Sequence, residues 1–249
     1  MGKLVSSKVP EIIALYWIIK IAATTLGETG ADMFSMTLQI GYDFTIALFL
    51  SLFIISLWFK LKQASYTPVL YWLTFTTSAI AGTAMSDYID RTLGFGYLQG
   101  SVLLLCLLLF ILALWYFKEG SLSVDQITSS KVEIYYWLAF LMANTLGTAL
   151  GDYMADDLTL GFLTSAGIIG GLLALCAVLH YFSNASSIIL FWLAFVLTRP
   201  FGATFGDFLT KPYSQGGIDI GTIGASIFFT SVLIIALIME LKRVAKHTD

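Results

Sequence analysis

Four aspartates recur along the chain, each near the end of an apolar stretch and each in the same local pattern. In every copy a glycine follows a tryptophan by ten residues, and the aspartate follows that glycine by five. The four aspartates are Asp32, Asp87, Asp152 and Asp207. A carboxylate in an apolar segment is costly and usually faces a bundle interior or a watery cavity. These side chains are therefore the first candidates for binding chemistry.

Polar side chains precede the aspartates at helical spacing. Glu28, Thr83 and Thr148 stand four residues before the aspartates of the first three copies, so each lies on the same side of a helix as its aspartate. Glu28 and Asp32 repel one another unless a cation or a proton lies between them. Carboxylate and hydroxyl oxygens suit hard cations such as Mn²⁺ or Mg²⁺. We therefore expect Glu28 and the four aspartates to bind a hard cation or a proton.

Two basic residues break the equivalence of the repeats. Lys20 stands where the other copies have phenylalanine, and Arg199 stands where the third copy has Asn144. Lys20 could reach the membrane interface or take part in substrate binding. Arg199 lies far from either helix end, and we expect its partner to be Glu28 or a repeat aspartate. Pro200 follows Arg199, so this dipeptide is either a hinge or a static kink.

Small residues accompany the aspartates at a spacing that favours close helix packing. The glycine of each copy is followed four residues later by another small residue. Such pairs let helix backbones approach closely in lipid, which predicts a tight bundle of the four segments that carry them. The pairs are Gly27 with Ala31, Gly82 with Ser86, Gly147 with Gly151, and Gly202 with Gly206.

Composition indicates a membrane protein. Of the 249 residues, 58% are hydrophobic and only 12% are charged, whereas soluble domains carry about 25% charged residues. Apolar runs of roughly 20 residues, enough to cross a bilayer, occur throughout. The lipid bilayer is thus an expected partner and nucleic acid is not. Cys106 and Cys176 lie inside apolar runs and indicate neither a disulfide nor a soft-metal site.

The repeats predict an all-α polytopic fold of eight transmembrane helices arranged as four parallel helical hairpins. Their expected ranges are 11–31, 43–60, 67–87, 97–117, 132–152, 162–182, 187–207 and 220–240. The polar stretch 118–131 would join two pseudo-symmetric halves, 1–120 and 121–249, within one transmembrane domain. In the fourth copy, an insertion around 211–217 lengthens the link that follows the aspartate.

Basic residues predict the orientation of the chain. Leaving aside Lys20 and Arg199 within the bundle, we expect Arg91 and Lys211 on the side of the aspartates and the remaining basic residues on the other side. The latter are Lys3, Lys8, Lys60, Lys62, Lys118, Lys131, Lys242, Arg243 and Lys246. The positive-inside rule then places both termini in the cytoplasm and the aspartates near the outer face. The aromatic pairs that open each copy would lie at the inner membrane interface, where such residues are enriched.

The motifs resemble those of a known family. Gly82-Thr-Ala-Met-Ser-Asp87-Tyr88 and Gly147-Thr-Ala-Leu-Gly-Asp152-Tyr153 fit best, whereas the first copy departs with Met33 after its aspartate. The chain resembles uncharacterised bacterial integral membrane proteins that carry four copies of a short repeat of unknown function. The resemblance covers nearly the whole chain and implies a multi-pass protein of the bacterial inner membrane, but it implies no activity.

The residues favour transport of a hard cation, with a divalent metal such as Mn²⁺ as the leading substrate and proton coupling left open. A cation channel with an aspartate ring is one alternative, and a carrier of a small organic or anionic solute recognised by Lys20 and Arg199 is another. The aspartates could also merely cap turns in a structural protein. No catalytic motif is present, so an enzyme is not expected, nor is a cofactor other than a bound hard cation. An oligomer is compatible with the sequence.

Overall fold

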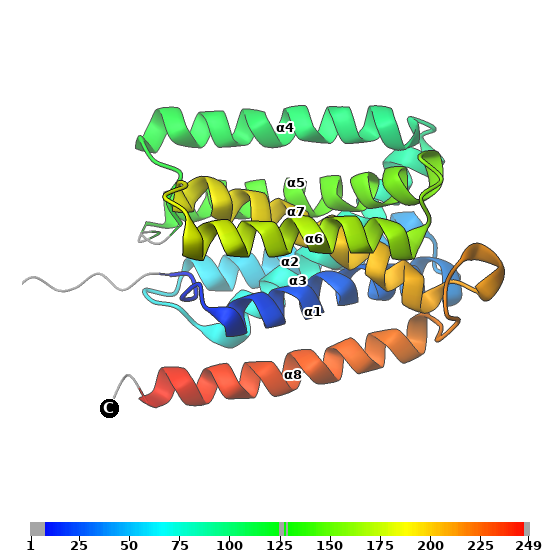
Figure 1. Cartoon of the computed structure of the whole chain (residues 1–249). Coiled ribbons are helices and arrows are strands. Elements are labelled where there is room, and N and C mark those ends of the chain that lie inside the picture. Colours follow the sequence, from blue (N-terminus) through cyan, green and yellow to red (C-terminus); the bar gives the residue numbers. More distant parts are fainter. Residues whose placement is uncertain (1–7, 125–126, 128, 247–249) are drawn as a thin grey trace, which may run out of the picture.

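The computed structural model describes residues 8–124, 127 and 129–246. These residues form eight α-helices and no strand. Figure 1 shows the helices running side by side as one bundle. Their bounds are α1 Ala14–Asp32, α2 Tyr42–Leu61, α3 Pro68–Asp87, α4 Gly96–Glu119, α5 Ser130–Asp152, α6 Phe162–Phe182, α7 Ser187–Thr210 and α8 Thr222–Lys246.

The expected helix ranges agree with these bounds to within a few residues, except that α8 extends six residues further. The sequence pattern did not predict how the first helices end. In the first three repeats the aspartate is the last α-helical residue, and a π-helical turn of five residues follows. These turns are η1 Met33–Thr37, η2 Tyr88–Thr92 and η3 Tyr153–Asp157. In the fourth repeat α7 continues beyond Asp207, and the inserted link contains a 3-10 turn, η4 Tyr213–Gln215.

The first helices of the repeats form a closed inner ring. Helix α1 packs against α3, α3 against α5, α5 against α7, and α7 returns to α1. We call these four the inner helices and α2, α4, α6 and α8 the outer helices. The expected tight bundle of first helices is therefore present, and it encloses a central axis.

The expectation of helical hairpins is wrong in one respect. Each outer helix packs mainly against the inner helix of the following repeat: α2 against α3, α4 against α5, α6 against α7, and α8 against α1. Figure 1 shows α4 and α8 on opposite sides of the bundle. Because the last outer helix closes onto the first inner helix, the repeats interlock rather than stand as separate hairpins.

The repeat glycines allow this close packing. A Cβ atom built on Gly27 would lie 2.7 Å from the Cβ of Ala79, and one on Gly147 would lie 2.3 Å from the Cγ of Arg199. Each of the four glycines meets the residue seven positions after the tryptophan of the next repeat. The pairs are Gly27 with Ala79, Gly82 with Asn144, Gly147 with Arg199, and Gly202 with Thr24. Gly151 and Gly206 continue the contacts one turn further on, against Ala203 and Glu28 respectively.

Within the described residues, five helices are long and apolar enough to cross a membrane: α2, α4, α6, α7 and α8. Several such helices suggest a multi-pass membrane protein. The other three, α1, α3 and α5, belong to the inner ring and carry buried polar side chains. Surrounding helices shield these polar groups, as expected for polar residues inside a membrane bundle.

The bundle has two chemically different ends. The ends of the described chain and the segment between α4 and α5 lie at one end, here called the terminal end, on the left in Figure 1. There Glu133 forms ion pairs with Lys8 at 2.9 Å and with Lys60 at 3.0 Å. The repeat aspartates lie at the opposite end, here called the aspartate end. Lys3 and part of the expected linker, residues 125, 126 and 128, lie outside the described residues.

Contrary to the expectation of an interfacial belt, the aromatic pairs of the second and third repeats are buried inside the bundle, whereas Trp17 and Phe191 of the other two pairs are half-buried. Tyr71, Trp72, Tyr136 and Trp137 are at most 1% exposed. The hydroxyls of Tyr71 and Tyr136 lie 2.5 Å apart, and the indole of Trp72 donates to Glu240 of α8 at 2.6 Å. These rings therefore form an aromatic core inside the bundle.

Candidate functional site

Each inner helix presents a stripe of side chains to the bundle interior, spaced four residues apart. In α1 the stripe consists of Tyr16, Lys20, Thr24, Glu28 and Asp32, all at most 3% exposed. A spacing of four keeps residues on one helix face. Because the inner helices form a ring, corresponding residues of the four repeats meet in layers along the axis.

The layer nearest the aromatic pairs closes the axis. The Lys20 amino group lies 3.1 Å from the ring centroid of Phe195, and Phe140 and Phe75 follow at 5.4 and 5.5 Å. It also donates a hydrogen bond to the Phe195 carbonyl at 3.0 Å. All four side chains are at most 1% exposed. The interpretation of Lys20 as an interfacial residue is therefore wrong, because its amino group is enclosed inside the bundle by three aromatic rings and the Phe195 carbonyl.

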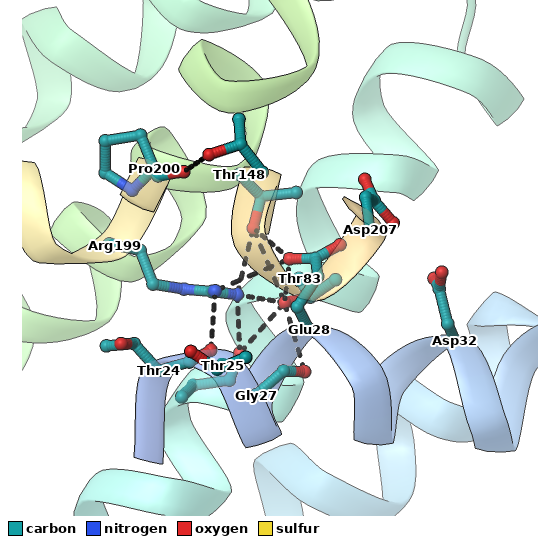
Figure 2. A network of polar contacts seen from close by, with 12 residues as sticks. Thr24, Thr25, Gly27, Glu28, Asp32, Thr83, Thr148, Arg199, Pro200 and Asp207 are labelled. Atoms are coloured by element: carbon teal, nitrogen blue, oxygen red, sulfur yellow. Dashed lines mark hydrogen bonds and ion pairs between the residues drawn. The ribbon is translucent and has the colours of Figure 1, made fainter. Parts of the chain in front are cut away.

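Arg199 lies in the next layer towards the aspartate end and is 1% exposed. Its Nη1 donates to the Thr24 carbonyl at 3.0 Å, and its Nη2 donates to the hydroxyls of Thr148, at 2.9 Å, and Thr83. Nη1 also lies 3.4 Å from Oε2 of Glu28, which forms an ion pair. Figure 2 shows Arg199 reaching from α7 towards Glu28 on α1. The expected pairing of Arg199 with an acidic group of the bundle is thus present.

Glu28 joins three repeats in one polar network. Thr83 and Thr148 each donate a hydrogen bond to its Oε2 at 3.3 Å, and their hydroxyls lie 3.4 Å apart. The fourth repeat contributes Ala203, which is fully buried and carries no polar group. Glu28, Thr83 and Thr148, which the sequence singled out and which stand four residues before their aspartates on three different helices, therefore meet in the structure.

The four aspartates form two pairs, each bridged by one basic side chain. Lys211 lies 2.8 Å from Asp32 and 3.2 Å from Asp207. Arg91 lies 3.5 Å from Asp87 and 3.4 Å from Asp152. Each basic residue thus joins the aspartate of its own repeat to that of the next. All four aspartates are at most 3% exposed.

The alternative that the aspartates cap the following turns is not supported in the described chain. Asp32, Asp87 and Asp152 stand at the N-caps of the π-helical turns, yet none makes a side-chain capping hydrogen bond. Their carboxylates instead face the basic side chains described above. The aspartates are therefore parts of a charged cluster rather than local turn elements.

One part of this cluster is richer in carboxylates than the rest. Among the described residues, Glu28, Asp32 and Asp207 each place one carboxylate oxygen within 4.8 Å of the other two. In Figure 2 Asp32 and Asp207 lie beyond Glu28, on the side away from Arg199. The corresponding position next to Asp87 and Asp152 holds Thr83 and Thr148 instead of a third carboxylate. We call Glu28, Asp32 and Asp207 the acidic triad.

The cluster holds more acidic than basic side chains. Its five carboxylates are Glu28 and the four aspartates, and its basic partners in the described residues are the three side chains of Arg91, Arg199 and Lys211. With every group ionised, five negative and three positive charges leave a net charge of two negative units. Buried charges need partners, so a divalent cation or two protons would balance this cluster.

A cavity of about 520 Å³ adjoins the cluster at the aspartate end. Arg91, Asp156, Asp207, Lys211 and Gln215 are among its lining residues. Although burial opposes charge on Lys211, the carboxylates of Asp207 and Asp32 raise its pKa above the ordinary value. Lys211 therefore remains protonated at neutral pH beside the acidic triad.

The remaining predicted site residues pack around this cluster. Asn144 donates a hydrogen bond to Ser78 at 3.0 Å and is 2% exposed. Pro200 lies inside α7, where its Cδ packs against Gly147 and its carbonyl accepts from Thr204 at 2.9 Å. The sequence reasoning missed the roles of Arg91 and Lys211 as partners of the aspartates. Their signal was that each stands four residues after an aspartate.

Comparison with known proteins gives a family match. A family model described as Repeat of Unknown Function (DUF347) matches the chain four times. The matched residues are 15–66, 70–121, 135–186 and 190–244. No significant match was found among curated proteins or among solved structures.

Proposed function

The chain belongs to the family defined by this Repeat of Unknown Function, and because that description names no activity, we propose from the site itself that the protein carries a hard cation across a membrane. The family confirms the expected four-copy repeat. The substrate favoured by the site is a divalent metal ion such as Mn²⁺ or Mg²⁺, and the acidic triad is its binding site.

The acidic triad is the observation that carries this proposal. Three carboxylate oxygens from α1 and α7 lie within 4.8 Å of one another in a buried setting. Arg199 and Lys211 pair with members of the triad, but two basic groups face three carboxylates. Like charges at this separation repel unless a further proton or cation lies between them. Carboxylate oxygens prefer hard cations, and the threonine hydroxyls around Glu28 are hard donors as well.

The charge balance favours a divalent ion over a monovalent one. The excess of two negative charges matches one divalent cation or two protons. Exchange of one metal ion for two protons would therefore keep the cluster neutral overall. This stoichiometry gives proton coupling a simple physical basis in the proposed carrier.

The filled axis supports a carrier rather than an open channel. Lys20, Phe75, Phe140 and Phe195 meet across the axis and are at most 1% exposed. These large side chains fill the axis at this layer and would oppose the passage of a free cation. An anion carrier has less support, because the Nη atoms of Arg199 already bind Glu28, the two threonines and the Thr24 carbonyl.

The proposed setting is the bacterial inner membrane, with all eight helices crossing it. The terminal end carries most of the basic residues, among them Lys60, Lys62, Lys118 and Lys131. The positive-inside rule then directs this end, and with it both termini, to the cytoplasm. The aspartates and the cavity would accordingly open towards the outer face.

Ion flux into liposomes tests the proposal. The purified protein is reconstituted, and uptake of Mn²⁺ is followed with an internal metal-sensitive dye. We expect uptake above that of empty liposomes and its loss in Asp207→Asn. The control is Asp157→Asn, an exposed carboxylate of the neighbouring link, which should retain uptake. Equal uptake by the Asp207→Asn protein and the wild type would contradict the proposal.

A further inference from the structure

Lys211 contributes a positive charge to the place where the proposed substrate would bind. Its amino group lies 2.8 Å from Asp32 and 3.2 Å from Asp207, two of the three residues of the acidic triad. A compact ammonium group on a flexible stem behaves as a point charge. Two carboxylates of the triad therefore already bind a small cationic group, the ammonium of Lys211.

The position of Lys211 allows its side chain to move without disturbing a helix. Lys211 follows the last residue of α7, where the backbone turns into an extended conformation. Its carbonyl accepts a hydrogen bond from the Asp219 amide at 3.0 Å, and Gly217 packs closely against the same carbonyl. The backbone of Lys211 is thus held by its own link. Lys211 contacts Asp32 only through its side chain, so this contact can break without a change in the backbone.

The adjoining cavity offers the amino group another polar environment. Lys211 itself lines the 520 Å³ cavity, together with Gln215 and the exposed carboxylate of Asp156. The Lys211 side chain is 19% exposed, whereas its two carboxylate partners are at most 4% exposed. A rotation of the lysine into this cavity would free both aspartates for the ion. The ammonium group would stay at the aspartate end, in the cavity that Asp207 also lines, so its charge still counts in the balance of the cluster.

Arg91 provides the matched comparison within the same molecule. It bridges Asp87 and Asp152 as Lys211 bridges Asp207 and Asp32. Its planar guanidinium spreads the charge over several donors, and Thr83 and Thr148 stand where a third carboxylate would be needed. The two halves of the aspartate cluster are therefore alike in charge pairing, but only the Lys211 half contains the acidic triad.

We infer that the Lys211 amino group is a built-in competitor for the substrate cation, which displaces it from Asp32 and Asp207 on binding. Lys211 thereby sets the affinity of the acidic triad and favours divalent over monovalent ions. A divalent ion brings one more positive charge than the lysine that it replaces, whereas a monovalent ion brings none. This inference rests on the proposed function and adds a residue that determines specificity.

Metal titrations of variants test the inference. Binding of Mn²⁺ and of Na⁺ is measured by calorimetry for the wild type, Lys211→Met and Arg91→Met. We expect Lys211→Met to bind Mn²⁺ at least about tenfold more tightly, or about 1.4 kcal/mol. We also expect Na⁺ to bind to Lys211→Met and not to the wild type. Arg91→Met removes the same charge and reports the general electrostatic effect, so its gain should be clearly smaller. Equal gains in both variants, or weaker binding in Lys211→Met, would overturn the inference.

Acylation of Lys211 in the wild type provides a second test that does not depend on folding of the variant. An amine reagent is added with and without Mn²⁺, and modified lysines are quantified by mass spectrometry. Displacement should speed the modification of Lys211, while exposed Lys118 reacts at an unchanged rate. A slower or unchanged rate at Lys211, in protein that binds Mn²⁺, would refute the displacement. Absence of Mn²⁺ binding in the wild type and in Lys211→Met would instead refute the proposed function.

Discussion

Arg199 on α7 and Glu28 on α1 form a buried ion pair of 3.4 Å between the fourth and first repeats. Both residues depart from the repeat consensus. The other three copies have no acidic residue at the position of Glu28 and no basic residue at the position of Arg199. The two exceptions to the four-fold pattern therefore meet each other. The inner ring closes at this contact, next to the proposed ion site.

Loss of one partner of this pair should cost stability. Arg199→Met leaves the Glu28 carboxylate buried without its basic partner, and breaking a buried pair in this way costs about 3–5 kcal/mol. The double variant Arg199→Met/Glu28→Gln removes the orphaned charge, so it should recover part of that loss. Denaturation in detergent measures both values. Losses that simply add would show that the two residues are not coupled.

The repeat glycine next to Arg199 should not tolerate a methyl group. Gly147→Ala would place a Cβ atom 2.3 Å from the Cγ and 2.4 Å from the Cβ of Arg199. Such overpacking costs about 1–3 kcal/mol, measured as a lower midpoint of thermal unfolding. Gly171→Ala in α6 is the control, because nothing lies within 4 Å of its added Cβ. Equal stability of the two variants would contradict the packing described here.

The sequence predicted the eight helices and the residues that face the bundle interior, because both follow from helical spacing. The four copies fixed which residues share a helix face, and Arg199 had few acidic partners available inside an apolar bundle. The packing of outer helices onto the following repeat was missed, because periodicity within a repeat does not state which neighbour a helix contacts. The burial of Lys20 was missed for a related reason. Three phenylalanines from the other repeats surround its amino group, and the pattern within one repeat does not reveal such contacts.

The ion pairs at the terminal end should be strong determinants of stability. Glu133 is fully buried between Lys8 and Lys60, so Glu133→Gln leaves two basic groups without their shared acid. We expect a loss of about 3–5 kcal/mol in a denaturation experiment. Glu11→Gln breaks the exposed pair with Arg243 and should cost at most about 1 kcal/mol. Similar losses in both variants would contradict this account.

Asp90 in the link η2 should make stability depend on pH. Burial raises the pKa of Asp90 from 3.8 to about 6, so the folded protein holds this proton more tightly than the unfolded chain. The contribution of Asp90 to stability therefore falls as the pH rises through the interval between about 4 and 6. Above that interval the folded protein carries a disfavoured charge, and below it the carboxyl is neutral in both states.

Asp90→Asn removes that disfavoured charge. A pKa raised from 3.8 to about 6 corresponds to about 3 kcal/mol at a pH above that interval. We therefore expect the unfolding temperature of Asp90→Asn to exceed that of the wild type by about 6–12 °C at pH 7.5, at about 2–4 °C per kcal/mol in a chain of this size, and to match it at pH 4. Asp219→Asn is the control, since Asp219 is exposed and asparagine also tolerates its positive φ. An equal shift at both pH values would show that the charge of Asp90 is not responsible.

The most direct test of the cation site is thermal stability of the purified protein in a series of ions: Mn²⁺, Mg²⁺, Ca²⁺, Zn²⁺ and Na⁺. A ligand that binds only the folded state at a hundred times its Kd stabilises it by about 2.7 kcal/mol. We predict stabilisation by a hard divalent cation that is lost in Glu28→Gln and retained in Asp157→Asn. Absence of a shift with every cation, or an undiminished shift in Glu28→Gln, would contradict an ion site at Glu28, Asp32 and Asp207.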